Sequence, residues 1–385
     1  MSEIKSEAKL TFIEATSIIV GHGVGAGILS VPYLASRTSW ADILWILAAA
    51  YGVNLLLHFM IAELSMNNGG AQFIKCFENE LFTGRLKKFA VWLAFGLLGL
   101  SVVVNIAGFL TGAAAVFRSW FGLPDIVGML IFYIIGAGVV FVGMKLVGIC
   151  EKIAVVSMVG VVGVLFAATL LAGTSPLSTA RHGINNILAL YSMTAFSLSA
   201  VMSAPQVVKG LGGSAKRVRG AIAAGTAVNA ALILLITFMT LLGAGGAITE
   251  DGALVDLSAR LGGWVGVVGY VFTLLALATS FWANTLNLRD IVAEQTKLGL
   301  RMSWLLSSVP CLVIAMLGLA SFVGFTRFAG IIQVVTGLGI ILAYARSRRR
   351  KGESPICGSF GTLPWRLIVI ASTLISTVGS VLKVS

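Results

Sequence analysis

Charged residues are scarce in this chain: Asp, Glu, Lys and Arg make up 11% of its 385 residues, whereas 58% are hydrophobic. A soluble domain carries about 25% charged residues, so the composition excludes an ordinary soluble protein. Cysteine is scarce too, and its four positions give neither a zinc-site spacing nor a disulfide framework: Cys76, Cys150, Cys311 and Cys357. His, Cys and carboxylate positions do not cluster, and no polar stretch is long enough for a signalling domain. We therefore expect neither an enzyme nor a cofactor.

The N-terminal sequence MSEIKSEAKLTF lacks the basic-then-apolar order of a cleaved signal peptide, so the first apolar run is expected to stay. Runs of about 20 apolar residues recur along the whole length, which is typical of an all-α polytopic membrane protein. The runs predict eleven transmembrane helices, at 12–35, 42–65, 89–117, 126–145, 152–172, 186–208, 219–243, 262–286, 302–320, 326–344 and 364–383.

Basic residues fall mainly on one side of this arrangement. With the N-terminus in the cytoplasm, 21 of the 27 Lys and Arg residues lie inside and 6 outside. The positive-inside rule therefore predicts a cell (inner) membrane protein with a cytoplasmic N-terminus and an external C-terminus. Because the basic residues of this +12 chain lie between spans, we expect the lipid bilayer, and no nucleic acid, as partner. The acidic external stretch at 248–257 is expected to be a solvated loop.

The first predicted span carries four alternating glycines within GHGVGAGILSVP, residues 21–32. Glycine pairs four residues apart also suit close helix packing, which is the alternative interpretation. The two pairs do not share a helix face, however, and His22 and Pro32 weaken the same span. We therefore predict an unwound segment between two half-helices, which lipid tolerates only where the backbone lines a cavity or is buried in protein.

The sixth span, residues 184–212, is the most polar of the chain and contains Pro205. Its serines would also suit hydrogen bonds to their own helix. Its position, five spans after the first, favours a second break near 196–200, as expected of inverted repeats. The predicted architecture is a single domain over 1–385, with a 5+5 inverted repeat (12–172 and 186–344), an extra helix (364–383), and helices 1 and 6 discontinuous.

Three stretches carry a resemblance to a known family. IVGHGVGAGILSVPYLA resembles the first-helix signature of the aromatic and hydroxy amino acid permeases and the amino acid/auxin permeases. AELSMNNGGAQF (62–73) and ALATSFWANTLNLRDI (276–291) are similar to helices two and eight of amino acid permeases. The chain thus resembles the amino acid–polyamine–organocation superfamily, with the sodium-symporter-like inverted-repeat fold.

The resemblance implies a substrate site at both breaks. The amides of Ala26 and Gly27 would hold the α-carboxylate, and Gly25 would allow its approach. The carbonyls of Gly23 and Phe196 would hold the α-ammonium. FSLS (196–199) is similar to the Phe-Thr-Leu-Ser of the sodium symporters, which offers Ser197 and Ser199 for polar contacts and Phe196 as an aromatic lid.

The resemblance also implies one sodium site, with ligands at Gly21, Val24, Ala276, Thr279 and Ser280. Thr279 and Ser280 follow Ala276 by three and four residues, so all three can approach one point, although both hydroxyls could instead bond their own helix. Span five has no lysine past Lys152 to replace the ion, as some proton-coupled relatives do. His22 is the possible proton site, or else a neutral ring bonded within the bundle.

The predicted function is secondary active, ion-coupled symport of neutral L-amino acids by alternating access, with Na⁺ favoured and a weak preference for bulky apolar or aromatic substrates. The alternative is a proton-coupled amino acid permease or an amino acid exchanger. A metal-ion transporter of this fold would need acidic and methionine ligands in the breaks, and the sequence has none there.

Overall fold

A computed structural model describes residues 9–179, 183–244, 248–249, 253–319, 322–352 and 354–382, and these residues form helices and their connections. The α-helices are α1 (Phe12–Gly23), α2 (Val31–Ser36), α3 (Trp40–Asn67), α4 (Phe73–Glu80), α5 (Lys87–Phe121), α6 (Asp125–Val142), α7 (Met144–Leu171), α8 (Ile184–Ser197), α9 (Ala204–Gly210), α10 (Ala215–Gly243), α11 (Ala253–Leu261), α12 (Trp264–Thr296), α13 (Leu300–Met316), α14 (Phe322–Lys351) and α15 (Leu363–Val381). Short 3₁₀ turns are η2 (Ala26–Leu29), η3 (Val201–Ser203) and η4 (Gly358–Gly361).

Every predicted span overlaps a helix or a broken pair of helices. Among the described residues, 8 helices are long and apolar enough to cross a membrane, or 9 if the bent first pair counts as one span. The all-helical membrane fold is thus confirmed, whereas the count of eleven and the repeat boundaries stay predictions. The solvated loop expected at 248–257 is wrong from Ala253 onward, because α11 begins there; residues 250–252 lie outside the described chain.

Both predicted breaks are present. The first pair, Phe12–Gly23 and Gly27–Ser36, is bent by 58°. In the sixth span, α8 ends at Ser197 and η3 begins at Val201. Each broken helix resumes as an α-helix with a proline in its first turn, Pro32 in α2 and Pro205 in α9. Proline fits there because it has no backbone N–H, and an N–H in the first turn of a helix would have no carbonyl of that helix to bond.

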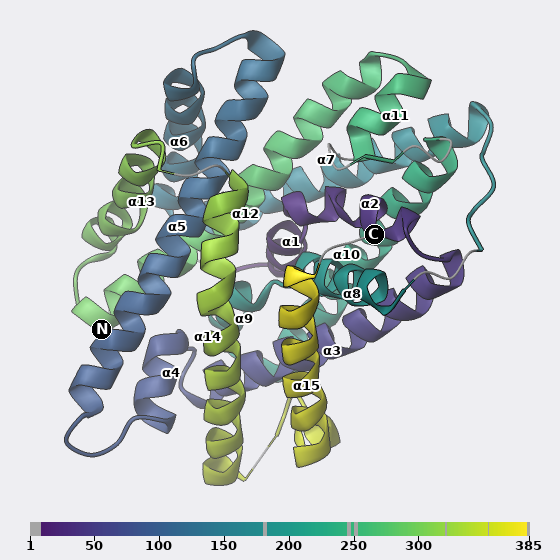
Figure 1. Cartoon of the computed structure of the whole chain (residues 1–385). Helices are drawn as coiled ribbons and strands as arrows, with labels where there is room; N and C mark the ends of the chain where they lie inside the picture. The colour runs from purple at the N-terminus through teal and green to yellow at the C-terminus, as the bar shows by residue number, and fades with distance from the viewer. Residues whose placement is uncertain are drawn as a thin grey trace.

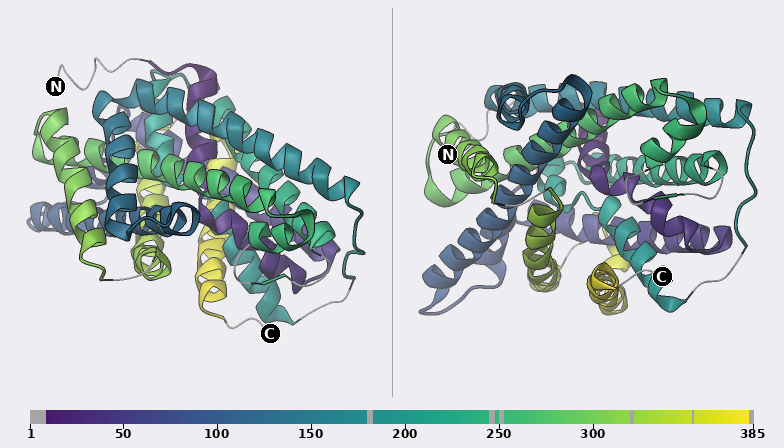
Figure 2. Two further views of the ribbon diagram at one scale, coloured as in Figure 1. Left: turned by 90° about the horizontal axis from the view of Figure 1, so that it is seen from above. Right: turned by 45° about the horizontal axis from the view of Figure 1, so that its top comes forward.

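The first broken helix lies in the middle of the bundle (Figure 1), where α1 packs against α7, α9, α10 and α12. Figure 2 shows α6 and α13 at one edge of the molecule and α11 at the other. The C-terminal helices pack against the outside, α14 on α5 and α15 on α8. One hydrophobic cluster includes Val24 and Ile28 from the first break and Leu198 from the second. The core therefore holds the two breaks side by side.

Candidate functional site

The two breaks touch directly. A Cβ atom placed on Gly23 would lie 3.5 Å from the Ser197 carbonyl oxygen. A Cβ placed on Gly27 would lie 2.9 Å from Phe196 Cδ1 and 3.0 Å from Ser197 Oγ. A side chain at position 27 would crowd Phe196 and Ser197, so Gly27 sets how closely the broken helices approach, whereas the 3.5 Å at Gly23 is ordinary contact.

The backbone of the first break departs from the hydrogen-bond pattern of a continuous α-helix. The Gly25 N–H donates to Gly23 O at 2.8 Å, so it does not reach Gly21 O, its partner in a continuous α-helix. Gly25 itself is extended, at φ −89° and ψ −173°. Ala26 and Gly27 open the turn η2, so no carbonyl one turn earlier is in place to accept from their amides. The break thus presents two donors beside carbonyl acceptors.

The second break is held by α3 through Asn54, which the sequence did not single out, and His58, which was predicted only to pack. His58 Nε2 accepts from the Ala200 N–H at 2.9 Å, while its Nδ1 lies 2.6 Å from Asn54 O. Asn54 Nδ2 donates to Ala195 O at 3.3 Å. A donor and an acceptor that the break exposes are therefore satisfied by α3. The only sequence signal for this role is an asparagine and a histidine four residues, or one helical turn, apart in an apolar span.

The predicted substrate residues of the second break differ in their surroundings. Ser197 is buried, and within the described chain its hydroxyl has no hydrogen-bond partner. Phe196 is 50% exposed, although it lies at the centre of the chain's most polar span, and its carbonyl accepts from the Ser199 N–H at 3.0 Å. Ser199 is half-buried. An open aromatic ring and an unpaired hydroxyl thus face the glycines of the first break.

The predicted sodium residues are buried where α1 meets α12. A Cβ on Gly21 would lie 2.9 Å from Thr279 Cβ, and one on Gly25 would lie 3.3 Å from Ser280 Oγ. Val24 and Ala276 lie in one hydrophobic cluster. Thr279 Oγ1 donates to Ala276 O at 3.0 Å, which is the bond to its own helix that the sequence left open. The hydroxyl oxygen keeps lone pairs for a cation.

Other polar residues join the first broken helix to its neighbours. His22 Nδ1 lies 2.7 Å from Ser203 Oγ, which links α1 to η3. Asn229 of α10 donates to Ile19 O at 3.2 Å. Glu151 of α7 packs against Gly21, where it would overlap a Cβ. The sequence analysis missed Glu151, because the predicted fifth span began at 152, whereas α7 begins at Met144, about two turns earlier.

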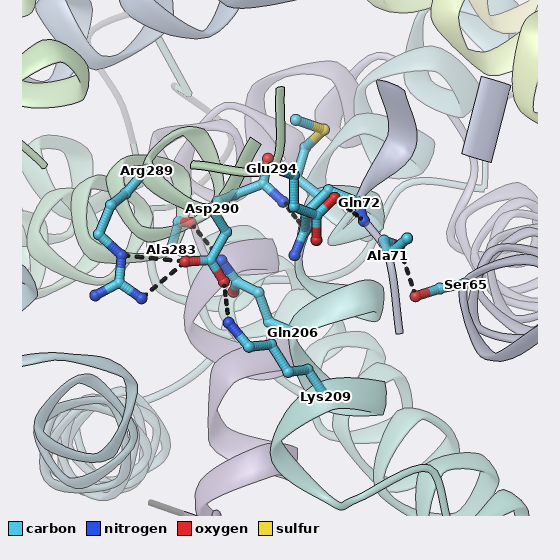
Figure 3. Close-up of polar contacts among 11 residues, drawn as sticks. Ser65, Ala71, Gln72, Gln206, Lys209, Ala283, Arg289, Asp290 and Glu294 are labelled. Atoms are coloured by element: carbon cyan, nitrogen blue, oxygen red, sulfur yellow. Dashed lines mark hydrogen bonds and ion pairs between the residues drawn. The ribbon is translucent and has the colours of Figure 1, made fainter. Parts of the chain in front are cut away.

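A second polar cluster lies near the ends of α3, α9 and α12, on the side that the distribution of Lys and Arg assigns to the cytoplasm (Figure 3). Asp290 accepts from Lys209 Nζ at 3.0 Å and from Arg289 at 2.8 Å. Glu294 accepts from the Gln72 N–H at 2.9 Å. These contacts tie the second half of the broken sixth helix to α12, and α12 to the segment after α3.

A helical membrane bundle whose two broken helices present paired donors and acceptors to each other is the architecture of a secondary transporter. The sequence profile of the tryptophan/tyrosine permease family matches residues 8–378, and the chain belongs to this family. It is a multi-pass membrane transporter rather than an enzyme, and the resemblance to amino acid permeases is confirmed.

Solved structures agree on the fold. A crystal structure of MhsT in complex with L-phenylalanine is similar at a TM-score of 0.67 and 14% identity, over 97% of this chain and 99% of that one. Mhp1, a nucleobase-cation-symport-1 family transporter in a closed conformation with bromovinylhydantoin bound, is similar at 0.63 and 14%, over 97% and 92%. No curated protein matches the sequence.

Proposed function

We propose that this chain carries aromatic amino acids, tryptophan and tyrosine foremost, across the cell membrane by alternating access. The observation that carries the proposal is the direct contact between the two breaks at Gly27, Phe196 and Ser197. The family supports the substrate class, since it is the tryptophan/tyrosine permease family. The crystal structure of MhsT, which has a similar fold, is of a complex with L-phenylalanine.

The zwitterion of an amino acid suits this pair of breaks. Its carboxylate would accept from the amides of Ala26 and Gly27, and its ammonium would donate to the carbonyls of Gly23 and Phe196. A buried carboxylate needs such donors, because burial without hydrogen bonds is costly. The Ser197 hydroxyl adds a polar contact. The exposed Phe196 ring would stack on an aromatic side chain, in the offset or edge-to-face arrangements that aromatic pairs prefer.

Ion-coupled transport needs a cation site, and this site would lie where α1 meets α12. Gly21, Val24, Ala276, Thr279 and Ser280 supply oxygen atoms there, of the kind that hard cations prefer. A cation at this point would bridge the first break and α12, and so would fix the shape that the substrate needs. His22 would link the two breaks through Ser203 rather than carry the ion, because its ring is already engaged.

Gly25 offers the sharpest test of the substrate site. An added Cβ there meets one atom, Ser280 Oγ at 3.3 Å, so we expect the fold to accept a side chain that crowds the amides of Ala26 and Gly27. Gly25→Val should weaken tryptophan binding about a hundredfold or more, since hydrogen bonds to a charged group contribute about 1.5–3 kcal/mol each. Equilibrium binding of radiolabelled tryptophan to the purified protein measures this.

The matched control is Gly160→Val, because Gly160 of α7 has no atom within 4 Å of an added Cβ. It should bind tryptophan as the wild type does. If a folded Gly25→Val protein also bound tryptophan normally, the substrate site would lie elsewhere. If the wild type bound leucine as well as tryptophan in competition, the aromatic part of the proposal would be wrong.

A further inference from the structure

Glu151 lies at the junction of three helices. It belongs to α7, and its carboxyl occupies the space that a Cβ on Gly21 would need. The same hypothetical Cβ lies 2.9 Å from Thr279 Cβ of α12. A carboxyl from α7, the backbone of α1 just before its break, and a hydroxyl-bearing residue of α12 therefore meet at one point. Only glycine at position 21 leaves room for the carboxyl.

This carboxyl is buried without a partner. Glu151 is 0% exposed, and within the described chain neither of its oxygen atoms has a hydrogen bond. The other buried carboxylates differ in this respect. Glu63 accepts from Tyr344, Ser354 and two backbone amides, Glu14 pairs with Lys145, and Asp290 pairs with Lys209 and Arg289.

The helices that pack on α7 do not supply the missing positive charge. They are α1, α6, α10 and α12. Most titratable side chains of these helices already contact a residue other than Glu151. The contacts are Glu14 with Lys145, His22 with Ser203, Asp125 with Arg118, Tyr133 with Ser308, Tyr270 with Trp120, Arg289 with Asp290, and Glu294 with Gln72. Lys216, Arg217 and Arg219 are exposed at the start of α10, and Cys150 and Lys152 beside Glu151 are half-buried.

An ionised carboxylate that is buried among helices and unpaired is costly, and such residues in membrane proteins mark ion pathways. Oxygen acceptors lie beside Glu151. Gly21 O lacks its usual helical donor, because the Gly25 N–H bonds Gly23 O, and Thr279 Oγ1 has lone pairs left after donating to Ala276 O. The site offers a carboxyl group and neutral oxygens, and within the described chain nothing donates a hydrogen bond to the carboxyl.

We propose that the Glu151 carboxyl is the group that binds the coupling cation, a proton on the carboxyl or a sodium ion shared with Gly21 and Thr279. This inference rests on the proposed transport function. Bound cation neutralises the carboxyl and lets α7 close on the first break. Loss of the cation leaves a bare charge against Gly21, which disfavours the closed break and releases the substrate. Linkage makes the effect mutual, so substrate also strengthens cation binding.

Glu151→Gln tests this assignment, because glutamine keeps the shape and removes the charge. Wild-type protein in proteoliposomes should accumulate tryptophan under an inward sodium gradient or an inward proton gradient. Glu151→Gln should lose accumulation under both gradients yet still exchange internal for external tryptophan. Glu14→Gln is the control, since Glu14 lies on α1 facing α7 but is paired with Lys145; it should keep the ion dependence of the wild type.

Two results would overturn the assignment. One is Glu151→Gln that accumulates tryptophan with unchanged ion dependence. The other is a folded Glu151→Gln that also loses exchange, because Glu151 would then serve substrate binding. The gradient that drives the wild type shows whether the cation is sodium or a proton, and loss of that dependence in Glu151→Gln shows that Glu151 binds it.

A measurement without substrate separates this inference from the proposed function. The melting temperature of the wild type should rise with sodium against choline, or with falling pH, and that of Glu151→Gln should not, since only the native site binds the cation. With substrate, the cation should lower the tryptophan Kd about tenfold in the wild type and leave it unchanged in Glu151→Gln. An equal ion response of both proteins would contradict the assignment even if tryptophan proved not to be a substrate.

Discussion

Each glycine of the first break has its own neighbour. An added Cβ at Gly21 would overlap Glu151, and one at Gly23 would overlap Asn229. One at Gly27 would crowd Phe196 and Ser197, whereas one at Gly25 would approach only Ser280. The sequence predicted the break, because alternating glycines with a histidine and a proline do not suit one continuous helix. It did not identify these neighbours, since they come from helices distant in the chain.

At Gly23 the contact can be tested as a pair. A methyl group there would overlap Asn229 Nδ2, which donates to Ile19 O. Gly23→Ala should therefore destabilise the protein by about 1–3 kcal/mol, the usual cost of overpacking. Asn229→Ala removes the clashing atoms, so the double variant should be less destabilised than the sum of the single variants. Thermal unfolding followed by tryptophan fluorescence measures all three.

Gly160→Ala serves as the control, because an added Cβ there meets no atom within 4 Å. Strictly additive effects of Gly23→Ala and Asn229→Ala would show that the two positions are not in contact.

At the scale of helices, the sequence located the spans better than their ends. Hydropathy reports the part of a helix that faces lipid, and it stops where polar side chains begin. Span eight was predicted to end at 286, but α12 continues to Thr296 and carries Arg289, Asp290 and Glu294. These side chains are paired inside the protein, which hydropathy alone does not reveal. Glu151 was missed for the same reason at the start of α7.

The cluster around Asp290 predicts that removal of Asp290 and removal of Lys209 destabilise the protein unequally. Arg289 is 2% exposed, whereas the Lys209 side chain is 16% exposed. Asp290→Ala would remove the carboxylate that pairs with the buried Arg289, and breaking a buried ion pair in this way costs about 3–5 kcal/mol. Lys209→Ala leaves the Arg289–Asp290 pair in place and should cost clearly less. Thermal unfolding of the two purified variants measures the difference, and equal destabilisation would refute the role assigned to Arg289.

For the whole molecule, the orientation in the membrane stays a prediction from the distribution of Lys and Arg. The distribution of Lys and Arg assigns the ends of α3, α9 and α12 to the cytoplasm, and these ends carry the charged cluster of Figure 3. Opening of the site toward the cytoplasm would have to separate α9 from α12 at Lys209 and Asp290. At the breaks themselves, by contrast, the two helices meet at Gly27, Phe196 and Ser197. Which side of the membrane each end of the site opens to is therefore an expectation from the predicted topology.

The central claim is that a cation gradient drives aromatic amino acids through the paired breaks. Uptake of radiolabelled tryptophan into proteoliposomes, with sodium and proton gradients imposed separately, tests it most directly. The account predicts accumulation above equilibrium under one of the two gradients, with loss of accumulation when an ionophore dissipates that gradient. Tryptophan that merely equilibrates under both gradients, or does not enter at all, would contradict the account.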